Sequence, residues 1–158
     1  MPSLSVSDLL TLHDFVADLP ADRRQRLATA GRPVFRGTGH RLFHQDTPAD
    51  RFWLVHSGTV ALDFHVPGRG HIVVEHAGPG AVVGWSWARP PYLWRFGAVV
   101  ADDIRAIEMD AVRVREMIAE DAELGRELTA RLLDTVSARL QAARHRLVEL
   151  YAYPDVTP

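Results

Sequence analysis

Residues 78–96 bring together residue types that commonly build a binding pocket. They read Gly-Pro-Gly-Ala-Val-Val-Gly-Trp-Ser-Trp-Ala-Arg-Pro-Pro-Tyr-Leu-Trp-Arg-Phe. Three glycines within the first seven residues let the backbone turn tightly or approach a bound group closely. Three of the chain's four tryptophans follow within ten residues and supply large flat surfaces. The stretch therefore predicts the wall of a pocket.

Arg95 and the aromatic side chains are the groups in this stretch that could bind a ligand. A guanidinium forks onto a phosphate or a carboxylate, so Arg95 is a candidate anion-binding residue, the alternative being a surface or cap-bonding arginine. The aromatic rings either fill the interior or bind an apolar or planar ligand. Trp87 and Trp94 could instead face a partner protein, where exposed aromatic residues tend to be hot spots. The aromatic residues concerned are Trp85, Trp87, Tyr92, Trp94 and Phe96.

Three histidines and a glutamate are the candidate metal ligands. A catalytic metal needs three converging ligands, but His65 and His71 are separated by a Pro-Gly turn. His71 and Glu75 are expected on one strand face, with His76 on the other. A cupin-like metalloenzyme, which would need a tight His-x-His motif, is therefore the least favoured alternative. We expect no metal, no catalytic residues and no enzyme, because no Ser-His-Asp order, Walker-type loop or paired carboxylates are visible.

Composition limits the remaining function classes. A chain of 158 residues with 47% hydrophobic residues fits one domain, and a net charge of -2 argues against a protein that coats nucleic acid. The absence of cysteine excludes disulfides and thiol chemistry. The acidic N-terminus does not resemble a signal peptide, and the apolar runs are too short to span a membrane. We expect a cytoplasmic protein that does not bind membranes.

The elements around this stretch are predicted from hydrophobic periodicity. A helix over Ser7–Leu19, capped by Ser7 or Asp8, and a second from Ala21 or Asp22 to Ala28 precede Gly31. Between Pro33 and Met109 short alternating runs predict strands that close into an antiparallel, jelly-roll-like β-roll. The predicted strands include one from Phe52, a hairpin of Val60–Val66 and His71–His76 around Pro67-Gly-Arg-Gly, and Ala98–Val100 and Ile104–Met109 with Asp102 and Asp103 between them.

A helical region follows Met109 and predicts self-association. Ala111–Ala119 forms a short helix, and Asp121 caps a long one that reaches Tyr151. Apolar residues recur three and four residues apart along it, as in a heptad seam, with basic flanks. The helix would be about 45 Å long, more than a domain this small easily covers, which favours a homodimer over internal packing. The predicted interface is Leu133, Val136, Leu140, Ala143, Leu147 and Leu150, and the basic and polar flanks are Arg131, Arg139, Arg144, His145 and Arg146.

This order of elements resembles the cyclic-nucleotide-binding domains of the CRP/FNR family. Supporting residues are Gly39-His-Arg-Leu-Phe and Asp46-Thr-Pro-Ala-Asp-Arg-Phe-Trp-Leu-Val-His-Ser-Gly-Thr-Val, which are similar to that family's signature. The resemblance implies an α+β fold with N-terminal helices, the β-roll and a long C-terminal dimerisation helix. The expected organisation is residues 1–119 for the roll domain, 120–152 for the long helix and 153–158 for a tail.

The family's phosphate-binding cassette is altered in this chain. It normally reads Phe-Gly-Glu and, further on, Arg-Ser/Thr-Ala, whose carboxylate accepts from the ribose and whose guanidinium holds the phosphate. Here Val83-Gly84-Trp85 replaces Phe-Gly-Glu, Arg95 lies at or within one residue of the arginine, and Phe96-Gly replaces Ser-Ala. Arg144, on the long helix, lies where the family brings helix residues to the base. The candidate ligand-binding residues are Val83, Gly84, Trp85, Ser86, Trp87, Arg95, Phe96 and Arg144.

We therefore predict a non-enzymatic sensor or regulatory module. It would bind a small effector, either a cyclic nucleotide such as cAMP or cGMP or a different molecule, and signal through a homodimer to a protein partner. No further cofactor is expected. Transcriptional members of the family continue into a helix-turn-helix domain, whereas this sequence ends at Pro158, so we expect no direct DNA binding. The alternative is a degenerate, ligand-free structural or adaptor dimer, which the missing glutamate favours.

Overall fold

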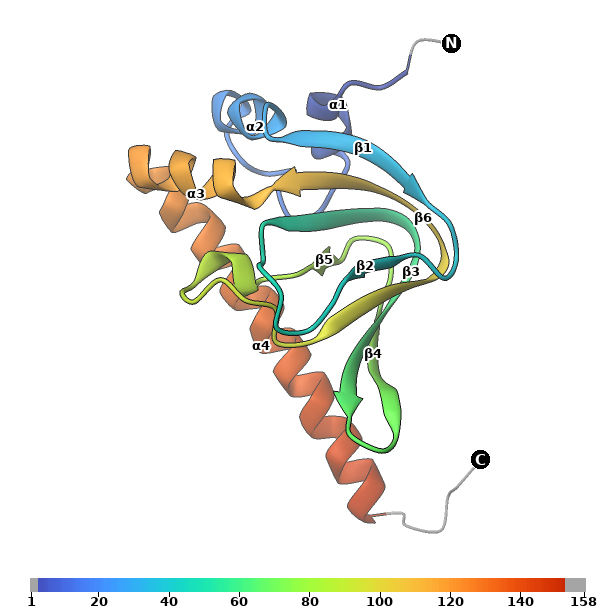
Figure 1. Cartoon of the computed structure of the whole chain (residues 1–158). Helices are drawn as coiled ribbons and strands as arrows, with labels where there is room; N and C mark the ends of the chain where they lie inside the picture. Colours follow the sequence, from blue (N-terminus) through green and yellow to red (C-terminus); the bar gives the residue numbers. More distant parts are fainter. Residues whose placement is uncertain (1–2, 153–158) are drawn as a thin grey trace.

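The computed structural model describes residues 3–152 and shows a β-roll with helices at both ends of the chain (Figure 1). The predicted tail, residues 153–158, lies outside the described residues. The predicted α+β architecture, an antiparallel roll between N-terminal helices and a long C-terminal helix, is confirmed. In chain order the elements are α1 (Val6–Thr11), α2 (Ala21–Ala28), β1 (Gly31–Arg36), β2 (Arg41–Phe43), β3 (Arg51–Val66), β4 (Gly70–Ala77), β5 (Val82–Val83), the 3-10 helix η1 (Ser86–Ala88), β6 (Gly97–Asp110), α3 (Ala111–Glu120) and α4 (Ala122–Ala152).

Two long strands, β3 and β6, form the frame of the roll. The sheet order is β1-β6-β3-β4, with β2 paired to β6 and β5 paired to β3, and every pairing is antiparallel. The register between β3 and β6 shifts around Ser57 and Thr59, and these irregularities accompany the bend that Figure 1 shows in both strands. Gly58 has a φ of +84°, and a Cβ there would lie 2.1 Å from the carbonyl oxygen of Asp103. The bend therefore requires glycine at this position.

The structure corrects three predicted boundaries. The strand predicted from Phe52 and the strand predicted at Val60–Val66 are one strand, β3. The predicted strands Ala98–Val100 and Ile104–Met109 are one strand, β6, which stays paired with β3 through this region, with Asp102 opposite Thr59 and Arg105 opposite Ser57. The carboxylate of Asp103 accepts hydrogen bonds from the backbone N–H and hydroxyl of Thr38, at 2.8 and 2.9 Å. The first helix ends at Thr11 rather than Leu19, and Ser5 caps it in a capping box with Asp8. The second helix and the hairpin between β3 and β4 are confirmed.

The core fills the space between the two walls of the roll and extends under α3 and the start of α4. Buried residues of the long strands, such as Leu54, Val60 and Ile107, meet Leu124 and Leu128 of α4 and the helix residues Leu10 and Leu27 in one hydrophobic cluster. None of the helices within residues 3–152 has the length and apolarity needed to cross a membrane.

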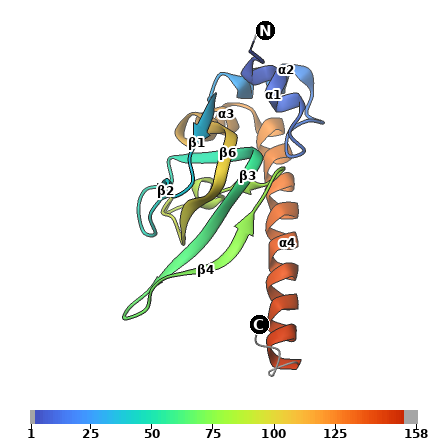
Figure 2. The ribbon, with the colours of Figure 1, turned by 90° about the vertical axis from the view of Figure 1, so that its right-hand side faces the viewer.

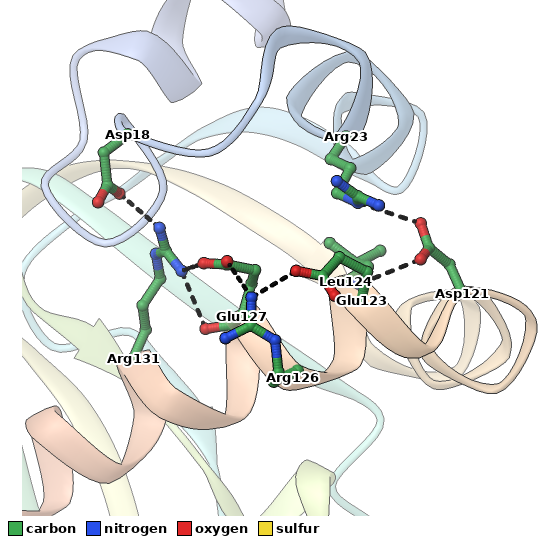
Figure 3. A network of polar contacts seen from close by, with 8 residues as sticks. All are labelled: Asp18, Arg23, Asp121, Glu123, Leu124, Arg126, Glu127 and Arg131. Atoms are coloured by element: carbon green, nitrogen blue, oxygen red, sulfur yellow. Dashed lines mark hydrogen bonds and ion pairs between the residues drawn. The ribbon is translucent and has the colours of Figure 1, made fainter.

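A polar network fixes the beginning of α4 to the N-terminal segment (Figure 3). Arg131 donates to Asp18 at 2.7 Å and also contacts Glu127, one turn earlier. Arg23 of α2 pairs with Asp121 at 3.3 Å. Asp121 also accepts the backbone N–H of Leu124 at 3.2 Å, which confirms it as the cap of α4, and this hydrogen bond lowers the pKa of its carboxyl.

Beyond this network α4 extends past the roll and runs near β4 (Figure 2). Its buried residues lie in its first three turns and end at Leu132. Several predicted interface residues are exposed, among them Leu133, Leu140, Leu147 and Leu150, whereas Val136 and Ala143 are partly covered. The end of α4 therefore presents apolar side chains that its own roll does not cover.

A buried ion pair links β2 to β3, two strands that each pair with β6. Arg41 donates to both carboxylate oxygens of Asp63, at 3.1 and 2.7 Å, and the Asp63 side chain is 3% exposed. The hydrogen bonds from Arg41 hold the pKa of Asp63 below its ordinary value. A carboxyl whose pKa is lowered by folding stabilises the fold above its unfolded pKa, and that stabilisation is lost as the pH falls through the folded pKa.

We predict that Asp63→Asn lowers the free energy of unfolding by about 2 kcal/mol at pH 7, because it removes a charged acceptor of two hydrogen bonds. The difference from the wild type should narrow as the pH falls below about 4, the ordinary pKa of an aspartate, because the unfolded chain then binds a proton at Asp63 that the folded chain does not yet bind. Urea unfolding at a series of pH values measures this, with Asp102→Asn at an exposed position of β6 as the control. A difference that stays constant between pH 7 and pH 3 would contradict the role of the ion pair.

Candidate ligand-binding site

The segment from Gly78 to Phe96 crosses the inside of the roll as a short strand, a tight turn and a 3-10 helix. Val83 and Val82 of β5 pair with Trp53 and Leu54 of β3, and both valines are buried. Gly84 then takes a φ of +99° and lies against the ring of Trp94. The predicted pocket wall is thus held by pairing with β3 and by packing of Gly84 against Trp94.

Two of the tryptophans in this segment are core residues. Trp87 is fully buried and stacks on Phe52 with ring centroids 4.3 Å apart, and its indole N–H donates to the carbonyl of Gly84 at 3.1 Å. Trp94 is 1% exposed and stacks on Phe43 at 3.7 Å. The expectation that Trp87 and Trp94 face a partner protein is wrong, because stacking and burial hold both rings inside the roll.

A cavity of about 290 Å³ lies between the roll and α4. Its walls come from three parts of the chain: the β3–β4 hairpin, the rings that flank η1, and one face of α4. Most of its lining is apolar. The lining residues are Leu62, Phe64, Val74, Glu75, Trp85, Phe96, Val136, Arg139 and Leu140.

Arg139 is the positive charge of this cavity. Its Nη2 donates to the carbonyl of Val82 at 2.6 Å, and its Nε lies 3.6 Å from a carboxylate oxygen of Glu75. The guanidinium carbon lies 4.7 Å from the ring centroid of Trp85, a cation–π contact. Nη1 is buried and has no hydrogen-bond partner among the residues that the structure describes. Burial lowers the pKa of this guanidinium, and the nearby Glu75 opposes the shift.

Trp85 and Phe96 bring aromatic rings to the cavity where the related cassette has a carboxylate and a hydroxyl. The centroids of these two rings are 5.2 Å apart, and Phe96 also lies 6.3 Å from Phe64. Phe96 is buried, whereas Trp85 is partly exposed. A ligand in this cavity would meet apolar surfaces and one guanidinium.

The structure separates the other predicted ligand-binding residues from this cavity. Arg95 is exposed and lines a second hollow of about 320 Å³ together with Ser86 and Arg89, and Trp85 stands between the two hollows because it lines both. The hydroxyl of Ser86 is buried without a hydrogen-bond partner among residues 3–152. Arg144 is exposed and does not line the cavity. Val83, Gly84 and Trp87 are buried and do not line the cavity.

Sequence reasoning placed Arg139 on the flank of the seam and missed its position in the cavity. The signal was present, because Val136, Arg139 and Leu140 are three and four residues apart and so share one helix face. What the sequence did not show is which side of the seam faces the roll. That depends on how the network at the start of α4 sets the rotation of the helix.

Two of the hairpin histidines, His65 and His71, lie together with ring centroids 5.3 Å apart, but Glu75 does not join them. Glu75 pairs with Leu62 while His71 pairs with His65, since a bulge at Val74 shifts the register between them. The prediction that His71 and Glu75 share a strand face is therefore wrong: the extra residue places them on opposite faces. No group of three possible metal ligands exists within residues 3–152.

The fold is that of a known class of regulatory domains. The family model of the cyclic nucleotide-binding domain matches residues 34–121, more than half of the chain, and the chain belongs to this family. The resemblance seen in the sequence is thereby confirmed. The family consists of ligand-binding regulatory domains, and nothing in the relatives described next points to catalysis.

Particular relatives narrow the comparison. A CRP-like cAMP-activated global transcriptional regulator of Mycobacterium tuberculosis is 26% identical over 119 residues, which cover 75% of this chain and 51% of the relative. The chain thus spans about half the length of the curated relative. A protein of Geobacter metallireducens assigned to the cyclic nucleotide-binding proteins has a TM-score of 0.78 and 26% identity over 89% of this chain and 99% of its own. The catabolite activator protein of Thermus thermophilus shares the fold, with a TM-score of 0.66 and 18% identity over 87% of this chain and 62% of its own.

We predict that Gly84→Ala destabilises the protein by roughly 3 kcal/mol, because alanine is strained at this positive φ and its Cβ would lie 2.5 Å from the Trp94 ring. Gly78→Ala is the matched control in the same segment, since a Cβ there meets nothing within 4 Å, and its effect should stay within about 0.5 kcal/mol. Thermal and urea unfolding measure both. Equal effects of the two substitutions would show that the turn at Gly84 is not tightly packed.

Proposed function

We propose that this protein is a non-enzymatic sensor module that binds a small effector in the cavity between the roll and α4. The observation that supports this most is the composition of the cavity wall: Phe64 and Phe96 come from the roll, whereas Val136 and Arg139 come from α4. A ligand in the cavity would contact both parts at once. Its binding energy would therefore depend on where α4 lies, which is the condition for coupling a ligand to a conformation.

The two ends of α4 fit this coupling. The first turns are buried and held by the ion pairs of Asp121 and Arg131, so they form a fixed end. The residues after Leu132 are largely exposed and contact the roll around the cavity through Val136 and Arg139. An effector would bias the position of this outer part of the helix.

The outer part of α4 would form a homodimer, and the dimer would transmit the signal to a protein partner. Leu133, Leu147 and Leu150 are 64%, 52% and 71% exposed and lie at heptad spacing. A parallel pair of such helices would bury them against each other. Effector binding would then alter the relative placement of two rolls and present a changed surface to the partner.

Two effector classes fit the site unequally. The Mycobacterium tuberculosis relative is described as cAMP-activated, which makes a cyclic nucleotide one candidate. Trp85 has no acceptor for ribose hydroxyls, and Arg95 faces the other hollow, so a different effector agrees better with the cavity. The packing of Phe96 against Phe43 and Phe64 supports the second candidate function, a ligand-free adaptor dimer.

We predict that Val74→Trp abolishes effector binding, because this side chain lines the cavity and would fill it. Val73→Trp is the matched control: the neighbouring residue is equally exposed but does not line the cavity. Thermal shift with cAMP, cGMP, cyclic dinucleotides and aromatic carboxylates compares the two variants with the wild type. A ligand present at about 100 times its Kd raises the free energy of unfolding by about 2.7 kcal/mol. Failure of every compound to stabilise the wild type would favour the adaptor.

We predict that Leu133→Asp combined with Leu147→Asp converts a dimer into a monomer, since both charges would lie within the apolar seam. These two positions are chosen because, unlike Leu140, they do not line the cavity. Ala142→Asp, an exposed position roughly opposite Leu140 on the helix, is the control and should leave the dimer intact. Sedimentation equilibrium measures the mass. A wild type that sediments as a monomer, or a double variant that remains dimeric, would contradict the proposed interface.

A further inference from the structure

Two features of the cavity between the roll and α4 specify the chemistry of its occupant. The first is an apolar wall from Leu62, Phe64, Phe96 and the Trp85 ring. The second is the Arg139 guanidinium, whose Nη1 is buried without a hydrogen-bond partner among the described residues. A buried donor that makes no hydrogen bond is costly and calls for an explanation, because most buried polar groups are paired.

We propose that the cavity binds an organic anion that has an aromatic or otherwise apolar body and a single carboxylate-like or sulfonate-like group, with Arg139 as the residue that recognises the charge. This inference rests on the proposed function, because it names the class of effector for the same cavity. The apolar body occupies the space between Leu62 and Phe96. The anionic group accepts a hydrogen bond from Nη1 and so completes the hydrogen bonds of the guanidinium.

The contacts of Arg139 explain why the ligand is an anion. Arginine keeps its charge at neutral pH, and burial makes this charge unfavourable, as the lowered pKa of the guanidinium reflects. Glu75 compensates the charge of Arg139 only in part, because its carboxylate lies 3.6 Å from Nε, which is longer than a hydrogen bond. A ligand anion supplies the missing partner.

The same contacts explain why the ligand is largely apolar and carries one charge. Among the lining residues, only Arg139, Glu75 and the indole of Trp85 have polar side-chain groups. A nucleotide would leave most of its ribose and base polar atoms without partners against such a wall. A second negative charge would approach Glu75 and be repelled by it.

A pair of fluorescent probes with the same aromatic body separates these contributions. 1-Anilinonaphthalene-8-sulfonate carries one sulfonate, and N-phenyl-1-naphthylamine is its uncharged counterpart. Fluorescence titration of the wild type should show at least about tenfold tighter binding of the sulfonate probe, the size expected for a charge-assisted hydrogen bond in a buried site. Val74→Trp should weaken both probes, and Val73→Trp should weaken neither.

Substitutions of Arg139 and Glu75 test which residue recognises the negative charge of the probe. In Arg139→Gln the preference for the sulfonate probe should fall to about twofold or less, while the neutral probe binds as before. Arg139→Lys should keep part of the preference. Arg144→Gln, at an exposed position of the same helix, is the matched control and should keep all of it. Glu75→Gln should strengthen binding of the sulfonate probe by about threefold or more and leave the neutral probe unchanged, which tests the inference even if Arg139→Gln does not fold.

The outcomes distinguish this inference from the proposed function. An undiminished preference for the sulfonate probe in folded Arg139→Gln, or an unchanged affinity in Glu75→Gln, would overturn the assignment of Arg139. If a cyclic nucleotide stabilises the wild type but not Val74→Trp, and neither probe binds, the sensor function stands and the ligand class is wrong. If no compound and neither probe binds, both fail.

Discussion

The contact between Arg139 and the roll is the interaction on which the proposed mechanism depends. One guanidinium donates to the carbonyl of Val82, lies near the carboxylate of Glu75 and stacks on Trp85. These groups come from β5, from the β3–β4 hairpin and from the segment that precedes η1. Any movement of the outer part of α4 must therefore disturb all three. A ligand that competes for the same guanidinium acts directly on the position of the helix, and no long-range coupling needs to be invoked.

The altered cassette changes the chemistry of the site without changing the fold. Glycines still allow the chain to turn behind the wall, as the positive φ of Gly84 shows. Trp87 and Trp94, although they lie within the cassette, belong to the core, where they stack on Phe52 and Phe43. Where the resemblance places the ribose carboxylate and the hydroxyl of the cassette, this chain has the rings of Trp85 and Phe96. The positive charge at the cavity comes from the helix instead of the cassette.

The sequence predicted the fold well because its signals are local. The Pro-Gly turn and the Asp121 cap are examples, and the structure confirms both. The strand predicted at residues 60–66 is the end of the longer β3, and residues 60–63 are all buried instead of alternating. The predictions that were wrong concern features that are determined by contacts between distant parts of the chain. Pairing with β3 keeps β6 continuous past Asp102 and Asp103, and the bulge at Val74 separates His71 from Glu75. Arg95 was preferred over Arg139 for the same reason, since the direction of each side chain depends on packing between distant segments.

The most direct test of the central claim is a crystal structure of the protein purified from cells without added ligand. We predict electron density for a small molecule between Phe96 and Arg139, with an acidic group within hydrogen-bond distance of the guanidinium. A molecule bound against Arg95 in the outer hollow, or a cavity closed by its own side chains with α4 in the same position, would contradict the account.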